Sequence, residues 1–317
     1  MIIPSYNGAR FLPTCLDALR RQTYRDFAVL VVDDGSTDDT AALLAGRYPE
    51  VRLLRRPRNG GLVAACNDGI AATGAELVCL LNNDTEAEPG WLAALVAALD
   101  AAPRAGSAAS KLLLFDRRDH LHSAGDGYRV TGLPANRGVW RRDRGQYDDQ
   151  PEIFGPCAGA ALYRRAMLAV LADGGRVLDD DLFMYCEDVD LNWRAQLAGY
   201  RSVFAPAARV YHHLSATGGG PLASYYTARN FLLLLAKDVP RPLLRRYWPR
   251  MVAAHAGRAW RAARSWRGAA ARATLRGYLA GLLLWPRSWR KRRDLERRFR
   301  PDLPRIEQLL IGSGRNA

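Results

Sequence analysis

Short apolar runs alternate with helical patterns over the first hundred residues. Leu12, Cys15, Leu16 and Leu19 recur at the spacing of one helix face, whereas Leu77–Leu81 is a continuous apolar run of strand length. Strands are predicted at residues 2–3, 28–32, 51–54 and 77–81, and helices at 12–19, after 36–38, at 61–72 and at 91–101. Strands that alternate with helices in this way indicate βαβ units and a mostly parallel sheet.

The pattern changes twice in the remainder of the chain. Residues 112–151 are rich in Gly, Asp and Arg and are expected to form irregular surface structure near a site. A strand is predicted at 159–163, a helix at 187–197 and a strand at 201–204, and from Tyr225 onward the pattern is helical. The fold class is therefore predicted as α/β. A nucleotide-binding domain over residues 1–225 is expected to precede a helical extension over 226–317.

The charge divides the chain at about the same position. Residues 1–225 hold 24 Lys+Arg and 27 Asp+Glu, whereas residues 226–317 hold 22 and 5, which gives the net charge of +14. Five of the eight tryptophans also lie in the last part. Basic helices with Trp at the border of an apolar face are typical of membrane interfaces. The extension is thus expected to lie on an anionic membrane surface, with a solvated helical cap as the alternative.

The sequence excludes several classes of protein. Its five scattered cysteines lack metal-type spacing and favour a reducing compartment. No signal peptide is recognised, and no apolar run approaches the ~20 residues that cross a bilayer. These features predict a cytoplasmic protein, peripheral on the inner face of the cell membrane. The chain also lacks the dinucleotide fingerprint and the P-loop, so a nucleotide would have to be bound in another way.

Polar side chains follow two of the predicted strands at the point where each strand ends. Val32 leads into Asp33 and Asp34, and Leu81 leads into Asn82, Asn83 and Asp84. Ligands of open α/β sheets bind outside the carboxyl ends of the strands. Clustered carboxylates at this edge suit a divalent metal that carries phosphates. The chain is therefore predicted to be a nucleotide-handling enzyme.

Several motifs stand out along the first part of the chain. They are Ile2-Ile3-Pro4-Ser5-Tyr6-Asn7-Gly8, Val32-Asp33-Asp34-Gly35-Ser36-Thr37-Asp38, Asn59-Gly60-Gly61 with Asn67, Asn82-Asn83-Asp84-Thr85, and Cys186-Glu187-Asp188-Val189-Asp190-Leu191. They occur in the order seen in family 2 glycosyltransferases, which the chain resembles from about Met1 to Asn230. The runs Val210-Tyr211-His212-His213-Leu214-Ser215 with Gly218-Gly219, and Tyr225-Tyr226-Thr227-Ala228-Arg229-Asn230, look most like the rhamnosyltransferase-like branch. The resemblance implies a GT-A fold and a nucleoside-diphosphate-sugar donor.

The resemblance also implies roles for individual residues. The expected nucleotide-sugar-binding residues are Pro4, Ser5, Tyr6, Asn7, Asp33, Asp34, Asn59, Gly60, Asn67, Asn82 and Asn83. Ionised carboxylates accept hydrogen bonds only, so Asp33 and Asp34 would receive donors of the base and ribose. Ser36 to Asp38 are expected to cap the following helix. For most of these residues the other interpretation is a turn or helix cap without chemistry.

A divalent cation, Mg²⁺ or Mn²⁺, is the cofactor that the resemblance implies. The family has an acidic triplet where this chain has Asn82, Asn83 and Asp84, so a single carboxylate remains. A carboxamide brings no charge, and affinity for a hard cation is expected to be weak. His212 would supply a second ligand, unless it is merely a solvent-facing residue at a strand end.

The Glu187-Asp188 pair is the expected catalytic block. It lies at the start of a predicted helix, where the positive end of the helix dipole favours ionised carboxylates. By resemblance, Asp188 would act as general base on the acceptor hydroxyl and the configuration would invert in one displacement. The alternative is that these carboxylates only occupy the N-terminal end of a helix and have no catalytic role.

The predicted function is transfer of a sugar, with rhamnose suggested by the branch, to a glycan or lipid-linked acceptor in cell-surface polysaccharide synthesis. Nucleic-acid binding would also explain the basic extension, but residues 1–225 are net acidic and carry no such motif. A catalytically inactive protein on the same fold is the third possibility, because two carboxylates of the triplet are missing.

Overall fold

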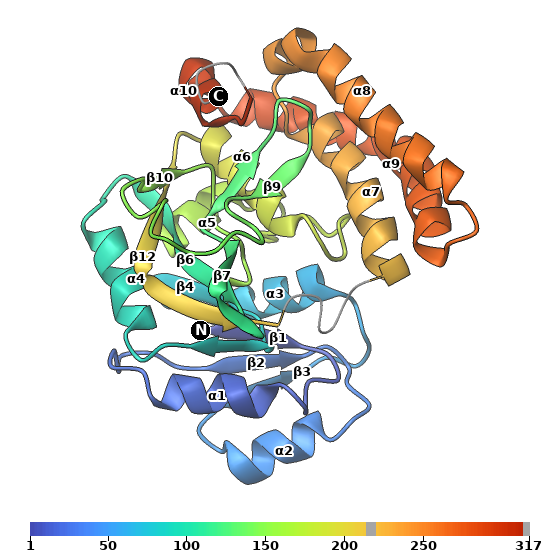
Figure 1. The fold of residues 1–317 in the computed structure, drawn as a ribbon. Helices are drawn as coiled ribbons and strands as arrows, with labels where there is room; N and C mark the ends of the chain where they lie inside the picture. Colours follow the sequence, from blue (N-terminus) through green and yellow to red (C-terminus); the bar gives the residue numbers. More distant parts are fainter. Residues whose placement is uncertain (214–219, 313–317) are drawn as a thin grey trace. The chain divides into compact units, whose positions relative to one another are not determined.

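The computed structural model describes residues 1–213 and 220–312 and has the predicted α/β class, so that expectation is confirmed (Figure 1). The motif residues Leu214, Ser215, Gly218 and Gly219 lie outside the described residues. Two compact units are present. The first comprises Met1–Asp126, Asn136–Phe183 and Tyr200–Leu214, and the second comprises Gly127–Ala135, Met184–Gly199 and Ser215–Ala317. The domain boundary predicted at residue 225 is not among these divisions and stays a prediction.

The first unit is built on one large sheet. Its strands run in the order β10-β12-β6-β11-β4-β1-β2-β3, and β5 and β7 pair with β12 and β6. They comprise β1 Ile2–Ser5, β2 Leu30–Asp33, β3 Arg52–Arg55, β4 Leu77–Leu81, β5 Thr85–Ala87, β6 Ala105–Leu114, β7 Arg117–Ser123, β10 Glu152–Ile153, β11 Ala160–Arg164 and β12 Arg201–His212. β1, β2, β3 and β4 are parallel, and so are β6 and β12, with β11 antiparallel between β4 and β6. The carboxyl ends of β1, β2, β4 and β12 therefore lie at one edge.

Helices cover both faces of this sheet, as expected for βαβ units. Ile3 and Val31 belong to the core that α1, α2 and α4 build on one face. On the other face α3 packs on β1 and β2, and a Cβ added at Gly69 would lie 2.4 Å from Ile2. A glycine there lets the helix approach the strand closely. The helices are α1 Leu12–Arg20, α2 Thr40–Arg47, α3 Leu62–Ala71, α4 Trp91–Asp100 and α5 Arg165–Leu171.

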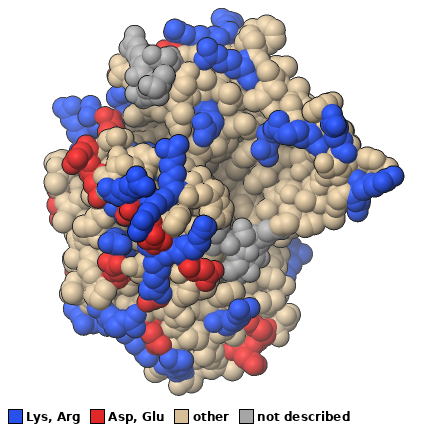
Figure 2. Space-filling model, viewed as in Figure 1, with Lys and Arg blue, Asp and Glu red and all other residues tan. Residues whose placement is uncertain are grey.

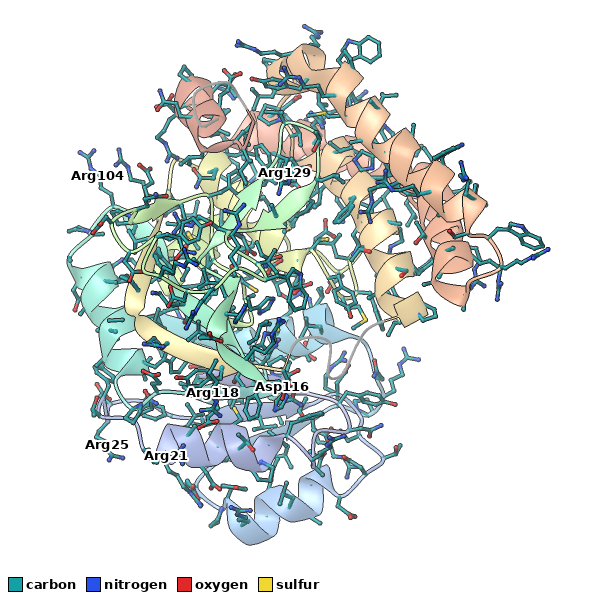
Figure 3. The ribbon with its side chains drawn as sticks, in the orientation of Figure 1. Arg21, Arg25, Arg104, Asp116, Arg118 and Arg129 are labelled. Carbon is teal, nitrogen blue, oxygen red and sulfur yellow. The ribbon has the colours of Figure 1, made fainter. Side chains whose placement is uncertain are left out.

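The expectation of irregular structure over residues 112–151 was wrong in part. β6 runs to Leu114, and β7 pairs with it antiparallel. β7 was missed because its first half is charged and exposed, as an outer strand can be. Figure 3 labels Arg118 on this strand; its guanidinium forms an ion pair with Glu86 of β5 and lies over the Tyr211 ring. The strand predicted at 201–204 likewise continues to His212 as β12.

The second unit is mostly helical. Its helices are α6 Glu187–Leu197, α7 Gly220–Lys237, α8 Arg241–Arg264, α9 Ala269–Arg298 and α10 Leu303–Leu309. The strands β8 Asp126–Tyr128 and β9 Pro134–Asn136, most of whose residues belong to this unit, form a small separate sheet. α6 has the predicted bounds. Among the described helices, none combines the length and apolar content needed to cross a membrane.

Candidate active site

The loop after β1 lies at the shared strand edge and is tied to the loop after β2. Asn7 donates its backbone N–H to Ser36 Oγ (2.8 Å), and its side-chain oxygen accepts from the Thr37 N–H (2.9 Å). Ser5 Oγ accepts from Asn83 Nδ2 (3.0 Å), which links the ends of β1 and β4. Pro4 is buried, whereas Tyr6 is 44% exposed. The Tyr6 ring is therefore the part of this loop that a base could stack on.

Asp33 and Asp34 have different surroundings although they are neighbours. Asp33 is fully buried and accepts from the Ser36 N–H through Oδ1 (2.9 Å). Its Oδ2 makes no hydrogen bond within the described residues and lies 3.3 Å from Arg55 Nε. Asp34 accepts from Arg56 and from the N–H groups of Gly60 (3.0 Å) and Gly61 (2.8 Å). Asp33 Oδ2 thus keeps an unused acceptor position beside Arg55, whereas Asp34 holds the 56–61 loop.

Asn67, another predicted nucleotide ligand, braces a distant loop. Its oxygen accepts from the N–H groups of Val177 (3.0 Å) and Leu178 (2.9 Å), and its Nδ2 donates to Leu178 O (2.9 Å) and to Asp180 (3.2 Å). These contacts use the whole hydrogen-bonding capacity of a carboxamide. They favour a structural role for Asn67, and its role in nucleotide binding stays a prediction.

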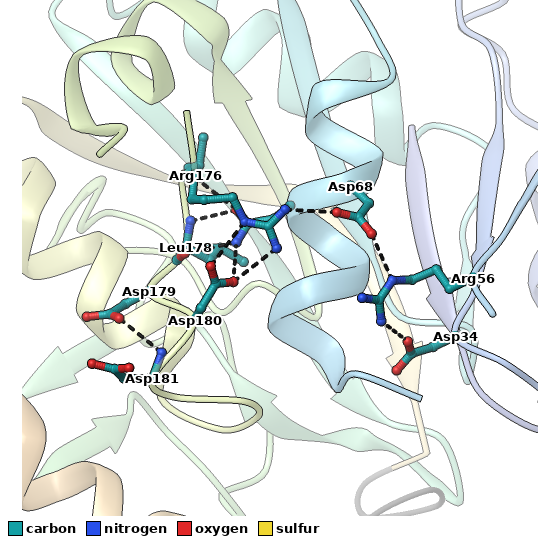
Figure 4. A network of polar contacts seen from close by, with 10 residues as sticks. Asp34, Arg56, Asp68, Arg176, Leu178, Asp179, Asp180 and Asp181 are labelled. Atoms are coloured by element: carbon teal, nitrogen blue, oxygen red, sulfur yellow. Dashed lines mark hydrogen bonds and ion pairs between the residues drawn. The ribbon is translucent and has the colours of Figure 1, made fainter. Parts of the chain in front are cut away.

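A chain of ion pairs connects Asp34, which holds the 56–61 loop, to the segment 176–180 that Asn67 also contacts (Figure 4). Arg56 bridges Asp34 and Asp68, the latter at 2.8 Å, and Arg176 bridges Asp68 (2.9 Å) and Asp180 (3.0 Å). The two guanidinium groups lower the pKa of Asp68 against the effect of its partial burial. Sequence reasoning missed Arg56 and Arg176, since no local spacing joins residues this far apart. Asn59 accepts from the Gly61 N–H (3.0 Å) within the same loop.

The predicted metal ligands Asp84 and His212 come together at the ends of β4 and β12. Both are buried, and Asp84 Oδ1 lies 3.1 Å from His212 Nε2. Asn82 Nδ2 lies 3.3 Å from the same ring nitrogen. His212 is therefore not a solvent-facing residue, which was the alternative for it. The long separation in sequence is closed by β5, which follows Asp84 directly and pairs antiparallel with β12, so that Thr85 lies opposite His212.

A second histidine, His122 of β7, completes this cluster and was not predicted. Its Nδ1 lies 2.9 Å from His212 Nδ1, and burial with the neighbouring His212 lowers its pKa to about 3. One of the two Nδ1 atoms must carry the hydrogen that they share. When it is on His212, the lone pair of His212 Nε2 is available to a metal.

This cluster fits a divalent cation. Asp84 Oδ1 makes no hydrogen bond within the described part of the chain, although it is buried. Two atoms that bind one cation at ~2.1 Å and at a right angle lie ~3.0 Å apart, close to the separation seen here. One carboxylate and one imidazole leave most of the coordination shell to other ligands, such as the oxygens of a diphosphate.

Glu187 and Asp188 begin α6 in the second unit. Glu187, Asp188 and Asp190 all lie in the first helical turn, and Asp188 Oδ1 accepts from the Val189 N–H (2.8 Å). Burial, reinforced by the charges of Asp188 and Asp190, raises the pKa of Glu187 to about 8. Glu187 would therefore be neutral at pH 7, and the role of Asp188 as general base stays a prediction.

Curated proteins and family models place the chain among sugar-transferring enzymes. The model described as Glycosyl transferase family 2 matches residues 1–171. The N-acetylglucosaminyl-diphospho-decaprenol L-rhamnosyltransferase of Mycobacterium tuberculosis (strain ATCC 25618 / H37Rv) is 31% identical over 256 residues, which cover 73% of this chain and 80% of that protein. A PGL/p-HBAD biosynthesis glycosyltransferase of Mycobacterium bovis (strain BCG / Pasteur 1173P2) is 40% identical over 101 residues, 31% of this chain and 40% of that protein.

Solved structures of glycosyltransferases share the fold. GalNAc-T7 with UDP, GalNAc and Mn²⁺ aligns with a TM-score of 0.60 at 17% identity, over 74% of this chain and 47% of that one. S. aureus TarS 1-349 in complex with UDP aligns with a TM-score of 0.54 at 17% identity, over 99% of this chain and 83% of that one. The family model matches more than half of this chain, and the mycobacterial relative is 31% identical over 73% of this chain. The chain therefore belongs to glycosyl transferase family 2.

Proposed function

We propose that this glycosyltransferase moves rhamnose from a nucleoside-diphosphate donor to a hydroxyl of a lipid-linked glycan, with inversion at the anomeric carbon. The mycobacterial relative supports the donor and acceptor classes, since its name describes rhamnosyl transfer to a diphospholipid-linked N-acetylglucosamine. The structures with bound UDP support a nucleotide-sugar donor for this fold. A role in cell-surface polysaccharide synthesis is part of this proposal.

The observation that carries the proposal is the pairing of Asp84 Oδ1 with His212 Nε2. A buried carboxylate oxygen without a hydrogen bond within the described residues is costly unless a ligand completes it. Asp84 and His212 would hold a divalent cation, Mg²⁺ or Mn²⁺, which when bound would offset the charge of the donor diphosphate. Asp33 and the exposed Tyr6 ring would bind the nucleoside.

Asp188 is the proposed general base. It takes the proton of the acceptor hydroxyl as the oxygen attacks the anomeric carbon, and the nucleoside diphosphate leaves with the electrons of the broken bond. Glu187, with its raised pKa, stays protonated at neutral pH, and the proposal requires Asp188 to carry the negative charge. Single displacement of this kind inverts the configuration.

A donor screen tests the function directly. The full chain is incubated with Mn²⁺, a polyprenyl-diphosphate-linked N-acetylglucosamine and a panel of nucleoside-diphosphate sugars that includes rhamnose, and released nucleoside diphosphate is measured. Turnover is expected with the rhamnose donor, and Asp188→Asn should reduce it by ~10²- to 10⁴-fold, the usual contribution of a general base. Turnover restricted to another sugar would contradict the rhamnose assignment, and no release with any donor would contradict the proposed reaction.

We also propose that the enzyme works on the inner face of the cell membrane, through the outer faces of α8 and α9. On α9, Arg272, Arg276, Leu279, Leu283, Arg287 and Arg290 recur every three or four residues and so share one helix face. Leu283 is 73% exposed, although leucine is usually buried. On α8 the exposed apolar residues are Trp248, Val252 and Trp260.

The charge of this surface specifies its partner. Figure 2 shows Lys and Arg side chains over the α8–α9 region, separated by uncharged surface and without Asp or Glu in that view. Exposed leucine and tryptophan flanked by arginine match a lipid interface, where the rings and aliphatic chains enter the headgroup layer and the cations meet anionic lipid. An anionic bilayer surface is therefore the occupant that we assign to it.

A further inference from the structure

The turn that precedes α6 has an unfavourable backbone conformation. Tyr185 and Cys186 have φ angles of 65° and 66°, in the left-handed region that residues with a side chain rarely adopt. Each such residue costs ~1 kcal/mol or more, so the surroundings must hold the turn in place. Cys186 is the N-cap of α6, and Glu187 is its first residue. The conformation of this turn therefore fixes where the two carboxylates begin.

Asn230 of α7 holds this turn. Its side chain is fully buried, and Nδ2 donates to the carbonyl oxygens of Met184 (2.9 Å) and Tyr185 (2.7 Å). Arg229 Nε donates to Asn230 Oδ1 (2.8 Å). Because a guanidinium can only donate, this contact fixes the oxygen end of the carboxamide and directs the amide end at the two carbonyls. No role was predicted from the sequence for the motif that ends at Asn230.

α7 is itself anchored within the second unit. Arg292 of α9 is buried and donates to the carbonyls of Leu235, Ala236 and Val239, at the end of α7. Lys237 near the same end forms an ion pair with Asp190, in the first turn of α6. α7 therefore holds the beginning of α6 from two sides, through Asn230 before the helix and through Lys237 within its first turn.

We propose that Asn230 is a positioning residue for catalysis, which keeps Glu187 and Asp188 in their reactive placement by holding the Met184–Cys186 turn. This inference rests on the proposed role of Asp188. A carboxylate that moves by ~1 Å can lose on the order of 10²-fold in rate, so a loss of the two hydrogen bonds should appear in kcat. Binding of the nucleotide, which uses residues of the first unit, should not change.

The test is Asn230→Asp, which keeps the shape of the side chain but replaces both N–H donors with an acceptor. Donor KM, nucleoside diphosphate affinity, kcat, its pH profile and amide exchange of the 184–190 segment are measured on the full chain. We expect kcat to fall by 10-fold or more, the pH profile to shift, and exchange in this segment to rise, with nucleotide affinity within twofold. Asn230→Ala serves as a second variant. Thr227→Ala, which removes a hydrogen bond internal to α7, is the matched control and should behave as the parent.

Two results would overturn the inference. One is an unchanged kcat and pH profile in both Asn230 variants. The other is a parallel loss of kcat, nucleotide affinity and thermal stability, as expected of a residue that only supports folding. If the parent chain turns over no sugar donor, the proposed function fails, and amide exchange of the 184–190 segment then decides by itself whether Asn230 holds the turn.

Discussion

Asp84 Oδ1 lies 3.1 Å from His212 Nε2, yet this buried oxygen makes no hydrogen bond within the described residues. Asp84 lies between β4 and β5, and β5 pairs antiparallel with β12 so that Thr85 lies opposite His212. His122 lies behind His212 and fixes its ring. In the proposed metal site, His122 would be the outer partner that holds the ring of His212, as such partners usually do for metal-binding histidines.

The first prediction is that metal binding depends on the nucleotide. A single carboxylate and one imidazole bind Mn²⁺ weakly, and the diphosphate oxygens complete the shell. Calorimetry should show poor Mn²⁺ binding to the free protein and tighter binding with nucleoside diphosphate. His212→Ala should weaken Mn²⁺ binding in the presence of nucleoside diphosphate by at least ~10-fold, because removal of even an outer-shell partner has an effect of this size.

The matched control is His120→Ala, because His120 contacts its neighbour Asp119 and not this cluster. It should leave Mn²⁺ affinity unchanged. Full activity in excess chelator would instead mean that Asp84 has a role other than metal binding.

The second prediction concerns stability against pH. Burial raises the pKa of Glu187 from its ordinary value of 4.5 to about 8, so the folded protein keeps a proton that the unfolded chain releases. The free energy of unfolding should therefore fall as pH rises from about 4.5 to about 8, with a slope of at most ~1.4 kcal/mol per pH unit from this group. Glu187→Gln, which cannot ionise, should make the curve flatter in this window.

Denaturant unfolding at pH 5, 6, 7 and 8 measures the effect. Glu50→Gln is the control, since the Arg20 hydrogen bond lowers the pKa of this exposed carboxyl and no proton is released between pH 5 and 8. A curve for Glu187→Gln that is parallel to that of the parent chain would show that Glu187 is ionised in the folded protein.

The third prediction concerns the close packing of α9 on α7. A Cβ at Gly277 would lie 2.2 Å from the backbone oxygen of Tyr225, whereas one at Gly257 of α8 would meet only the end of Arg261 at 3.6 Å. Alanine is the better helix former by ~1 kcal/mol. Gly257→Ala should therefore stabilise, while Gly277→Ala should destabilise by ~1 to 3 kcal/mol, the usual cost of overpacking. Equal shifts in the denaturation midpoint would refute the close contact.

The sequence predicted the parallel strands and α6 well, because buried strands are continuous apolar runs and α6 begins at an acidic turn. It could not show that Asp34 and Asn67 are engaged by protein partners, since these come from other loops. His122 was missed for the same physical reason. It lies on a polar outer strand, and its contact with His212 exists only because β7 and β12 both border β6.

The last prediction concerns the membrane surface. Removal of the C-terminal helices would test it poorly, because Arg292 of α9 caps the end of α7. Substitutions within the full chain avoid this difficulty. Each Arg or Lys near anionic lipid contributes ~1 kcal/mol, so the triple change of Arg276, Arg287 and Arg290 to Gln should weaken vesicle binding by about 10²-fold. The double change Leu279→Ser and Leu283→Ser should weaken it independently of salt.

Co-sedimentation with anionic vesicles, neutral vesicles and duplex DNA separates the possible partners. Binding of the parent chain should require anionic lipid and should weaken as salt rises, since exposed charges are screened beyond ~8 to 10 Å near physiological ionic strength. The control changes Arg21, Arg25 and Arg104 to Gln, three exposed arginines of the first unit labelled in Figure 3, and removes the same charge. Equal losses in the two triple variants would indicate attraction by net charge alone. A loss confined to the α9 variants, with the leucine pair contributing at high salt, would identify this helix face as the surface that enters the headgroup layer.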